Sequence, residues 1–231
     1  TKVSLRLKGD WTDHLQGSKW SFRVQTEATK SWNRLKTFSL QNPSTRSYLY
    51  EWLLHAFFNY EDILTTRYDF VQFELNNKDL GLYVYEEHFL KQIPEFNKKK
   101  EGPIVRFIES GFWDAMLQKD QLKADHDGSL IVGAPDIKPF GEKRTHKDSL
   151  LAQQFDIAHT LLYQYQYGLK EAKDIFDVDL YARYYVVMDL IGGYHGIAWH
   201  NQRFYYNQVI GKLEPIGFDG FGGEGLAYVP E

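Results

Sequence analysis

The stretch YDFVQFELNNKDLGLYVYEEHF, Tyr68 to Phe89, decides the fold class of this sequence. Apolar and polar residues alternate on both sides of its NNKD segment, which is the period of a β-strand with one buried face. Asn and Asp are residues that favour tight turns, so NNKD is expected to reverse the chain. The stretch therefore predicts a β-hairpin.

The segments before this hairpin predict further strands and one helix. KVSLRLKGD, KWSFRVQT and LKTFSLQN alternate in the same way. The period changes in NPSTRSYLYEWLLHAFF, where Asn42 is predicted as the N-cap and Pro43 stands at the first helical position. One helical face of this segment carries four apolar residues: Leu49, Leu53, Ala56 and Phe57.

The second half of the chain predicts helices and a second hairpin. Two long helices are expected, from Ser149 to about Gly168 and from Asp177 to Gly192, each ending in a glycine suited to a C-cap. The segment QRFYYNQVIGKLEPIGF then predicts a hairpin, and GPIVRFIES predicts one strand among the solvated loops of residues 91–149. Strands, helix, strands, loops, helices and hairpin in this order indicate an α+β fold.

Composition limits the class of protein. The chain has 231 residues, 43% hydrophobic, which allows one large domain or two small ones with a sizeable core. A net charge of −4 does not favour nucleic acid as a partner, and the absence of cysteine excludes disulfides and thiolate metal sites. No apolar run approaches the roughly 18 residues of a membrane span. Because the sequence starts inside a strand pattern, we expect a domain excised from a longer chain.

The stretch GKLEPIGFDGFGG, Gly211 to Gly223, ends an apolar run on one acid, Asp219, wrapped in glycines. The preceding loop, YHGIAWHN, carries His195, His200 and Asn201. An amide and a carboxylate brought together by a hairpin are hard oxygen ligands that suit Mg²⁺. Two alternatives stay open: an ordinary turn at Asp219, and a transition-metal site formed by the two histidines with Asp219, although no H-E-x-x-H motif is present.

Three blocks of this sequence resemble the CotH kinase family, the atypical protein kinases named for spore coat protein H. The first comprises LRLKGD, KWSFRV and LKTFSLQNPSTRSYLYEWL. The second is VQFELNNKDLGLYVYEEHF, which carries the family's Gly-x-Tyr-x-x-x-Glu strand at Gly81, Tyr83 and Glu87. The third is HNQRFYYNQVIGKLEPIGFDGFGG. The resemblance covers most of the chain.

The resemblance implies a protein-kinase-like α+β fold in a single domain over residues 1–231. A sheet-rich lobe, 1–110, would hold an N-terminal antiparallel sheet with one helix, and a helix-rich lobe, 149–231, would close on the β-hairpin. The implied activity is transfer of a phosphoryl group from ATP, with Mg²⁺, to Ser or Thr of a protein substrate. Asn201 and Asp219 would be the metal ligands, and Glu87 would lie on the strand that leads to the nucleotide cleft. Family members act on coat or exported proteins, which implies a location in a spore coat, secreted, or at the cell surface.

A basic residue from the early strands would then contact the phosphates. The candidates are Lys8, Lys19, Arg23 and Lys36. If KWSFRVQT is a strand, Phe22 and Val24 share one face and Arg23 points to the other, so Arg23 and Lys19 are the residues we select. For each of the four the alternative is a solvated strand face.

The sequence departs from the kinase pattern at the catalytic base. A kinase catalytic loop places an Asp five residues before the metal-binding Asn, and here that position is Gly196. His195 could take the proton instead, and Asp189 is the nearest acid upstream. The alternative function is a pseudokinase, a non-catalytic coat or surface protein that binds a protein or glycan partner through its aromatic residues.

Overall fold

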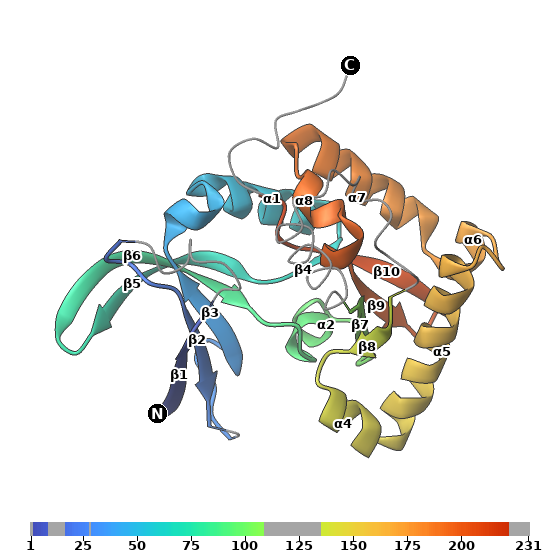
Figure 1. Ribbon diagram of the computed structural model, residues 1–231, viewed down its shortest axis with the longest axis horizontal. Helices are drawn as coiled ribbons and strands as arrows, with labels where there is room; N and C mark the ends of the chain where they lie inside the picture. Colours follow the sequence, from blue (N-terminus) through green and yellow to red (C-terminus); the bar gives the residue numbers. More distant parts are fainter. Residues whose placement is uncertain (1, 9–16, 28, 109–134, 222–231) are drawn as a thin grey trace, which may run out of the picture.

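The computed structural model describes residues 2–8, 17–27, 29–108 and 135–221. Two five-stranded sheets lie side by side, and helices pack on and between them (Figure 1). The α+β class predicted from the sequence is confirmed, and the architecture is compatible with a kinase-like fold.

The first sheet is antiparallel and has the strand order β1-β2-β3-β6-β5. Its strands are β1 (Val3–Leu7), β2 (Phe22–Thr26), β3 (Thr37–Gln41), β5 (Tyr68–Leu75) and β6 (Lys78–Glu87). The predicted hairpin is confirmed as β5 and β6. Its turn residues Asn76 and Asn77 have φ angles of 53° and 61°, the left-handed pair that a two-residue hairpin turn requires.

The two faces of the first sheet differ in chemistry. One face holds an apolar core: Phe22, Val24, Leu35, Phe38, Leu40 and Tyr83. On the other face Arg23, Ser39 and Glu86 lie opposite one another across β2, β3 and β6. We call the second face the polar face of the first sheet. Because side chains alternate along a strand, Glu86 belongs to the polar face and Glu87 to the apolar one.

The second sheet has the order β4-β10-β9-β7-β8. Its strands are β4 (Leu64–Thr65), β7 (Ile104–Phe107), β8 (Ile137–Pro139), β9 (Arg203–Asn207) and β10 (Lys212–Gly217). β4 runs parallel to β10, and the other pairs are antiparallel. The predicted closing hairpin is confirmed as β9 and β10, and the predicted strand in GPIVRFIES as β7.

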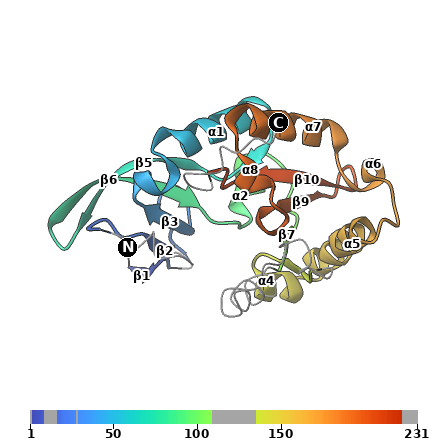
Figure 2. The same cartoon turned by 45° about the horizontal axis from the view of Figure 1, so that its top comes forward.

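The described helices are η2 (Pro43–Arg46), α1 (Leu49–Tyr60), α2 (Gln92–Phe96), α4 (Glu142–Lys147), α5 (Ser149–Gln166), α6 (Ala172–Ile175), α7 (Val178–Ile191), α8 (Tyr194–Ile197) and η4 (Trp199–Asn201). The two long predicted helices are confirmed as α5 and α7. The Asp177 side chain caps α7 by accepting from the Leu180 N–H, and Gly192, with φ 74°, ends it. In Figure 2, α1 and α7 lie above the second sheet and α5 lies below it.

The predicted helix at NPSTRSYLYEWLLHAFF is interrupted. Asn42 caps the short η2 turn, and positive φ angles at Ser47 and Tyr48 then separate η2 from α1. The apolar face that the sequence suggested is the outer one, since Leu49 is 64% and Leu53 43% exposed. The buried residues of α1 are Glu51, Leu54, His55 and Phe58. Two polar side chains can occupy this buried face because both have polar partners there, as described below.

Candidate active site

Asp219 lies two residues after the end of β10 and is buried, with a φ of 53°. The glycines around it allow close packing against α1. A Cβ on Gly217 would lie 2.1 Å from the Phe58 ring, and a Cβ on Gly220 would lie 2.4 Å from Leu54 Cδ2. A non-glycine residue held in the left-handed region at such a close approach is a feature that clusters at functional sites.

Two basic side chains approach the Asp219 carboxylate. Arg46 Nε is 2.7 Å from Oδ1 without the alignment of a hydrogen bond, so this contact is an ion pair. His195 Nε2 is 3.4 Å from Oδ2. Burial alone would raise the pKa of Asp219, but Arg46 and His195 outweigh it and hold that pKa well below its usual range. The carboxylate is therefore charged throughout the physiological pH range.

Asn201 contacts the backbone of His195. It ends η4, is buried, and donates from Nδ2 to the His195 carbonyl oxygen at 3.0 Å. This leaves its amide oxygen as the side-chain atom able to ligate a cation. The two residues that the sequence selected as metal ligands thus both contact His195.

The donor set fits magnesium better than zinc. Asp219 Oδ1 is buried and accepts no hydrogen bond from the described residues, and the Asn201 oxygen is a second hard ligand. Mg²⁺ typically takes one or two protein oxygens together with substrate phosphates and water. Within the described ranges, no three His, Cys, Asp or Glu side chains are arranged to hold a metal, which argues against the transition-metal alternative for His195 and His200.

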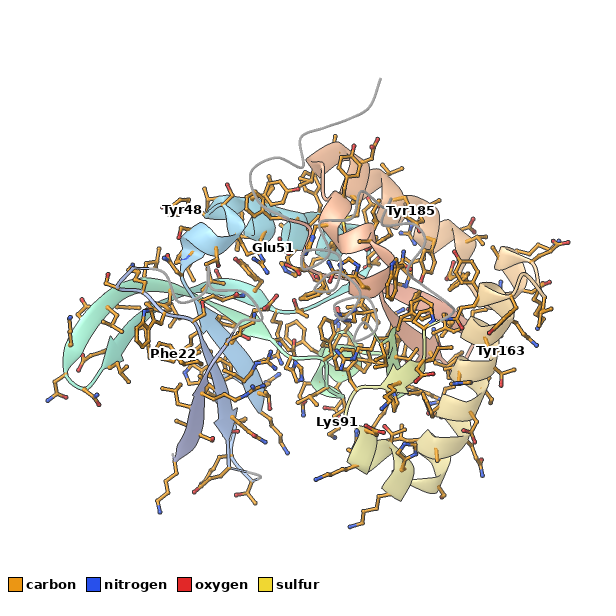
Figure 3. All side chains as sticks on the ribbon, in the orientation of Figure 1. Phe22, Tyr48, Glu51, Lys91, Tyr163 and Tyr185 are labelled. Carbon is orange, nitrogen blue, oxygen red and sulfur yellow. The ribbon has the colours of Figure 1, made fainter. Side chains whose placement is uncertain are left out.

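Helix α1 holds the segment that follows Asp219. The Glu51 carboxylate accepts from the backbone N–H groups of Gly220 and Phe221, each at 3.2 Å. Figure 3 shows Glu51 on the side of α1 that faces the interior. Burial, with the Asp219 charge as a further cause, raises the pKa of Glu51 to about 8. A helical carboxylate on two consecutive N–H groups fixes where Asp219 stands relative to α1.

His55 is linked by hydrogen bonds, through Thr65, to the end of β10, the strand before Asp219. Its Nδ1 bonds to the Thr65 hydroxyl, which in turn donates to the Gly217 carbonyl at 2.9 Å. Burial lowers the pKa of His55 to about 4, so the ring is neutral. Sequence reasoning missed Glu51 and His55. The signal for them was present, since Glu51, Leu54, His55 and Phe58 share one helical stripe and two of the four are polar.

Charged residues on the polar face of the first sheet interact electrostatically with Asp219. On this face Lys8 Nζ donates to Glu86 Oε2 at 2.8 Å, and Gln41 Nε2 donates to the same oxygen at 2.9 Å. Burial would raise the pKa of Glu86, but Lys8 lowers it, and Asp219 and Arg46 also act on it. Glu86 is therefore within electrostatic range of the Asp219 group. The sequence had offered Lys8 as one of four basic candidates and had missed Glu86 and Arg46.

A cluster of cations lies on and beside this polar face. Arg23 Nη1 is 2.9 Å from His88 Nδ1. The pKa of His88 is lowered to about 3, first by burial and then by the charges of Arg23, Lys8, Arg106 and Arg6. Arg106 comes from β7 in the second sheet, and its Nε is buried with no hydrogen-bond partner among the described residues. Cations from both sheets thus converge, an arrangement suited to phosphate groups.

Comparison with protein-family models matches residues 5–220 to the family described as CotH kinase protein. The chain belongs to the CotH kinase family. The match spans both sheets and includes Asn201 and Asp219, so the resemblance found in the sequence is confirmed. The search of curated proteins gives no match. Across the described ranges, no helix has both the length and the apolarity needed to span a bilayer.

Three other residues selected from the CotH kinase resemblance lie elsewhere. Lys19 donates to the Leu82 carbonyl at 3.2 Å and lies 5.7 Å from the centre of the Tyr83 ring, which belongs to the apolar core of the first sheet. Glu87 pairs with Arg67 on that same side of the sheet. Asp189 is exposed near the end of α7 and accepts from the Tyr194 hydroxyl at 3.0 Å. None of these contacts joins the three residues to the Asp219 group.

At the position of the kinase base, this CotH family member has no room for a side chain. Gly196 is buried, and a Cβ there would lie 2.5 Å from Met188 Cε and 2.6 Å from the Phe218 carbonyl oxygen. The methionine end could move, but the backbone oxygen is held by the segment that carries Asp219. The loop is therefore built around a glycine. His195, whose side chain is 33% exposed beside Asp219, is the titratable residue next to this position in the sequence.

Proposed function

We propose that this protein transfers the γ-phosphoryl group of ATP, with Mg²⁺, to a Ser or Thr hydroxyl of a protein substrate. Membership of the CotH kinase family suggests kinase-like chemistry in general. The observation that carries the specific proposal is that Asn201 and Asp219 both contact His195, while Asp219 also interacts electrostatically with Lys8 and Glu86 of the polar face of the first sheet. From membership of this family we also propose that the protein acts in a spore coat, as a secreted protein, or at the cell surface.

Asn201 and Asp219 would hold the metal through their side-chain oxygens. Bound there, Mg²⁺ would neutralise the charge of the phosphate oxygens and orient them for transfer. Arg46 acts as a positioning residue, since its ion pair with Asp219 holds that carboxylate in place. Glu51 holds the backbone that follows Asp219, since it accepts from the N–H groups of Gly220 and Phe221.

Arg23 and Arg106 are the residues we assign to the phosphates. They approach His88 from the two different sheets, together with Arg6 and Lys8. Arginine binds phosphate oxygens with two parallel N–H groups, and such charge-assisted hydrogen bonds are about twice as strong as neutral ones. This assignment keeps Arg23 from the sequence-based selection and places Arg106 in the role that Lys19 had been given.

In the transfer step the substrate hydroxyl oxygen forms a bond to the γ-phosphorus, and the bond from that phosphorus to the bridging oxygen breaks. The electron pair of the broken bond leaves with ADP. The hydroxyl proton passes to the imidazole of His195, which must be neutral to accept it. Asp189 remains the second candidate for this proton. Because phosphoryl transfer depends mostly on positioning and electrostatics, a histidine can serve where a kinase has aspartate.

One observation favours a second function. Because Gly196 admits no side chain, the carboxylate that serves as base in kinases is absent from its usual place. The second candidate is therefore a pseudokinase, a coat or surface protein that binds a protein or glycan partner without transferring phosphate. Exposed aromatic residues on α5 and α7, such as Tyr163 and Tyr185, would suit such a partner (Figure 3).

A transfer assay separates the two functions. The protein is incubated with γ-labelled ATP, Mg²⁺ and a panel of Ser- and Thr-rich proteins, and phosphate incorporation is measured. A kinase labels at least one substrate, and Asp219→Asn abolishes the labelling. His195→Gln should slow transfer by about 10² to 10⁴, the usual contribution of a general base. Nucleotide binding without any transfer would support the pseudokinase.

A further inference from the structure

Arg46 lies against the Asp219 oxygen that is otherwise available to a metal ion. Its Nε is 2.7 Å from Oδ1, the buried atom that accepts no hydrogen bond from the described residues. The other oxygen, Oδ2, lies 3.4 Å from His195 Nε2. Two positive charges in contact with one oxygen repel each other strongly in a buried site. A divalent cation can therefore bind to Oδ1 only if the Arg46 guanidinium moves away from it.

A displaced Arg46 would need another anion. Its side chain is only 18% exposed, and a largely buried charge without a partner is strongly unfavourable. Besides Asp219, the acids that act most strongly on Arg46 are Glu51 and Glu86. Glu51 accepts from two backbone N–H groups, and Glu86 accepts from Lys8 and a glutamine. The guanidinium would thus find both of these carboxylates already engaged.

Phosphate oxygens can supply the missing partner. Lys8, Arg46, Glu86 and Asp219 are two cations and two anions that act electrostatically on one another. A divalent cation added alone would leave this group with an excess of positive charge. A nucleotide brings anionic oxygens together with the metal, and a guanidinium binds such oxygens with two parallel N–H groups. The phosphates are therefore the anions for which Arg46 would exchange Asp219.

The backbone next to Arg46 separates it from helix α1. Arg46 ends the η2 turn, and Ser47 and Tyr48 follow with φ angles of 51° and 56°. Tyr48 also has a ψ of −95°, outside the regions that residues with a Cβ favour, and it is 63% exposed (Figure 3). Strain of this kind clusters at ligand clamps and switch regions. Arg46 can thus move while Glu51 keeps α1 on the segment after Asp219.

We propose that Arg46 makes the Asp219 site select the metal–nucleotide complex over the free metal ion. Without nucleotide, Arg46 stays on Asp219 and competes with the metal for Oδ1. With nucleotide, Arg46 binds the phosphates and releases Oδ1. The inference rests on the proposed function, because it requires metal and nucleotide to meet at Asp219. It requires no phosphoryl transfer and holds equally for a pseudokinase that keeps the nucleotide site.

The test compares two ligands on the whole chain. Binding of Mn²⁺ alone is measured by electron paramagnetic resonance, and binding of the Mn²⁺ complex of a non-hydrolysable ATP analogue is measured by calorimetry. The variant is Arg46→Gln. The control is Arg183→Gln, which removes the same charge from an exposed ion pair with Glu61. Arg46→Gln should bind Mn²⁺ alone about tenfold or more tightly than the wild type and bind the complex no more tightly. The control should stay within about twofold for both ligands.

A second measurement uses the wild type and does not depend on the folding of Arg46→Gln. The Nε–H resonance of Arg46 is followed by NMR and assigned by its loss in Arg46→Lys, which keeps the charge. It should shift when the metal–nucleotide complex is added and stay in place with the same concentration of Mg²⁺ alone.

Three results would count against the inference. It is overturned alone if the wild type binds the complex while Arg46→Gln binds Mn²⁺ no more tightly than the wild type does. It is also overturned alone if the wild type binds the complex and the Arg46 resonance does not move. A wild type that binds no complex overturns the proposed nucleotide site and this inference with it.

Discussion

Gly196 shows at the scale of one residue why the kinase base cannot simply be restored. An aspartate there would bring its Cβ within 2.6 Å of the Phe218 carbonyl oxygen. We predict that Gly196→Asp destabilises the protein by about 1–3 kcal/mol and does not increase phosphate transfer. In a thermal melt this corresponds to about 2–4 °C for each kcal/mol in a chain of this size. A variant that melts like the wild type and transfers phosphate faster would contradict this packing.

The lowered pKa of His55 leads to a second prediction at the residue scale, about how the free energy of unfolding depends on pH. The folded ring has a pKa lowered to about 4, whereas an unfolded chain would bind a proton near pH 6.5. The unfolded state therefore binds more protons in this window, and the His55 contribution to stability is lost as the pH falls from about 6.5 toward 4. We predict a smaller acid slope in His55→Gln, measured by urea unfolding at pH 7, 6, 5 and 4.

The control for this prediction is His146→Gln, because His146 is 55% exposed. The limiting slope for one proton is about 1.4 kcal/mol per pH unit. Glu51 acts in the opposite sense, since its raised pKa costs stability as the pH rises from about 4.5 toward 8. Identical acid slopes in wild type, His55→Gln and His146→Gln would show that His55 titrates normally in the fold.

At the scale of elements, the close contact between helix α1 and the end of β10 can be tested by mutation. Gly217 lies so close to Phe58 that an added Cβ would be 2.1 Å from the ring. We predict that Gly217→Ala costs about 1–3 kcal/mol, and that Phe58→Leu relieves part of this cost when both changes are combined. A double-mutant cycle by denaturant unfolding measures the coupling. Strict additivity would mean that the two elements do not touch as described.

Elements with a clear period could be predicted from the sequence, and short ones could not. The hairpin of β5 and β6 follows from alternation, and α5 and α7 follow from their capping residues. Helices α2, α6 and α8 span five residues or fewer, which is too short for a 3.6-residue period to appear. The core stripe suggested for α1 was wrong for a different reason. Leu49 and Leu53 have helical spacing but are exposed, and the buried face carries Glu51, which accepts from the Gly220 N–H of a distant segment.

The site depends on contacts between distant segments, and this limits what the sequence can predict at the scale of the molecule. Asn201 and Asp219 lie near each other along the chain, and the family pattern identifies them. Arg46 and Glu51 precede Asp219 by more than half of the chain, and no local pattern links them to it. Glu86 and Glu87 are adjacent residues of the same type. Only the register of β6 with β3 decides which of the two faces the site.

The most direct test of the central claim measures stabilisation by nucleotide with and without metal. At ATP about 100 times its dissociation constant, with Mg²⁺, the free energy of unfolding should rise by about 2.7 kcal/mol in the wild type. Asp179→Asn, an exposed acid at the start of α7, should behave like the wild type. Asp219→Asn should fold and lose most of the Mg²⁺-dependent gain. Equal stabilisation with and without Mg²⁺, or a full gain in Asp219→Asn, would contradict a metal-assisted nucleotide site at Asp219.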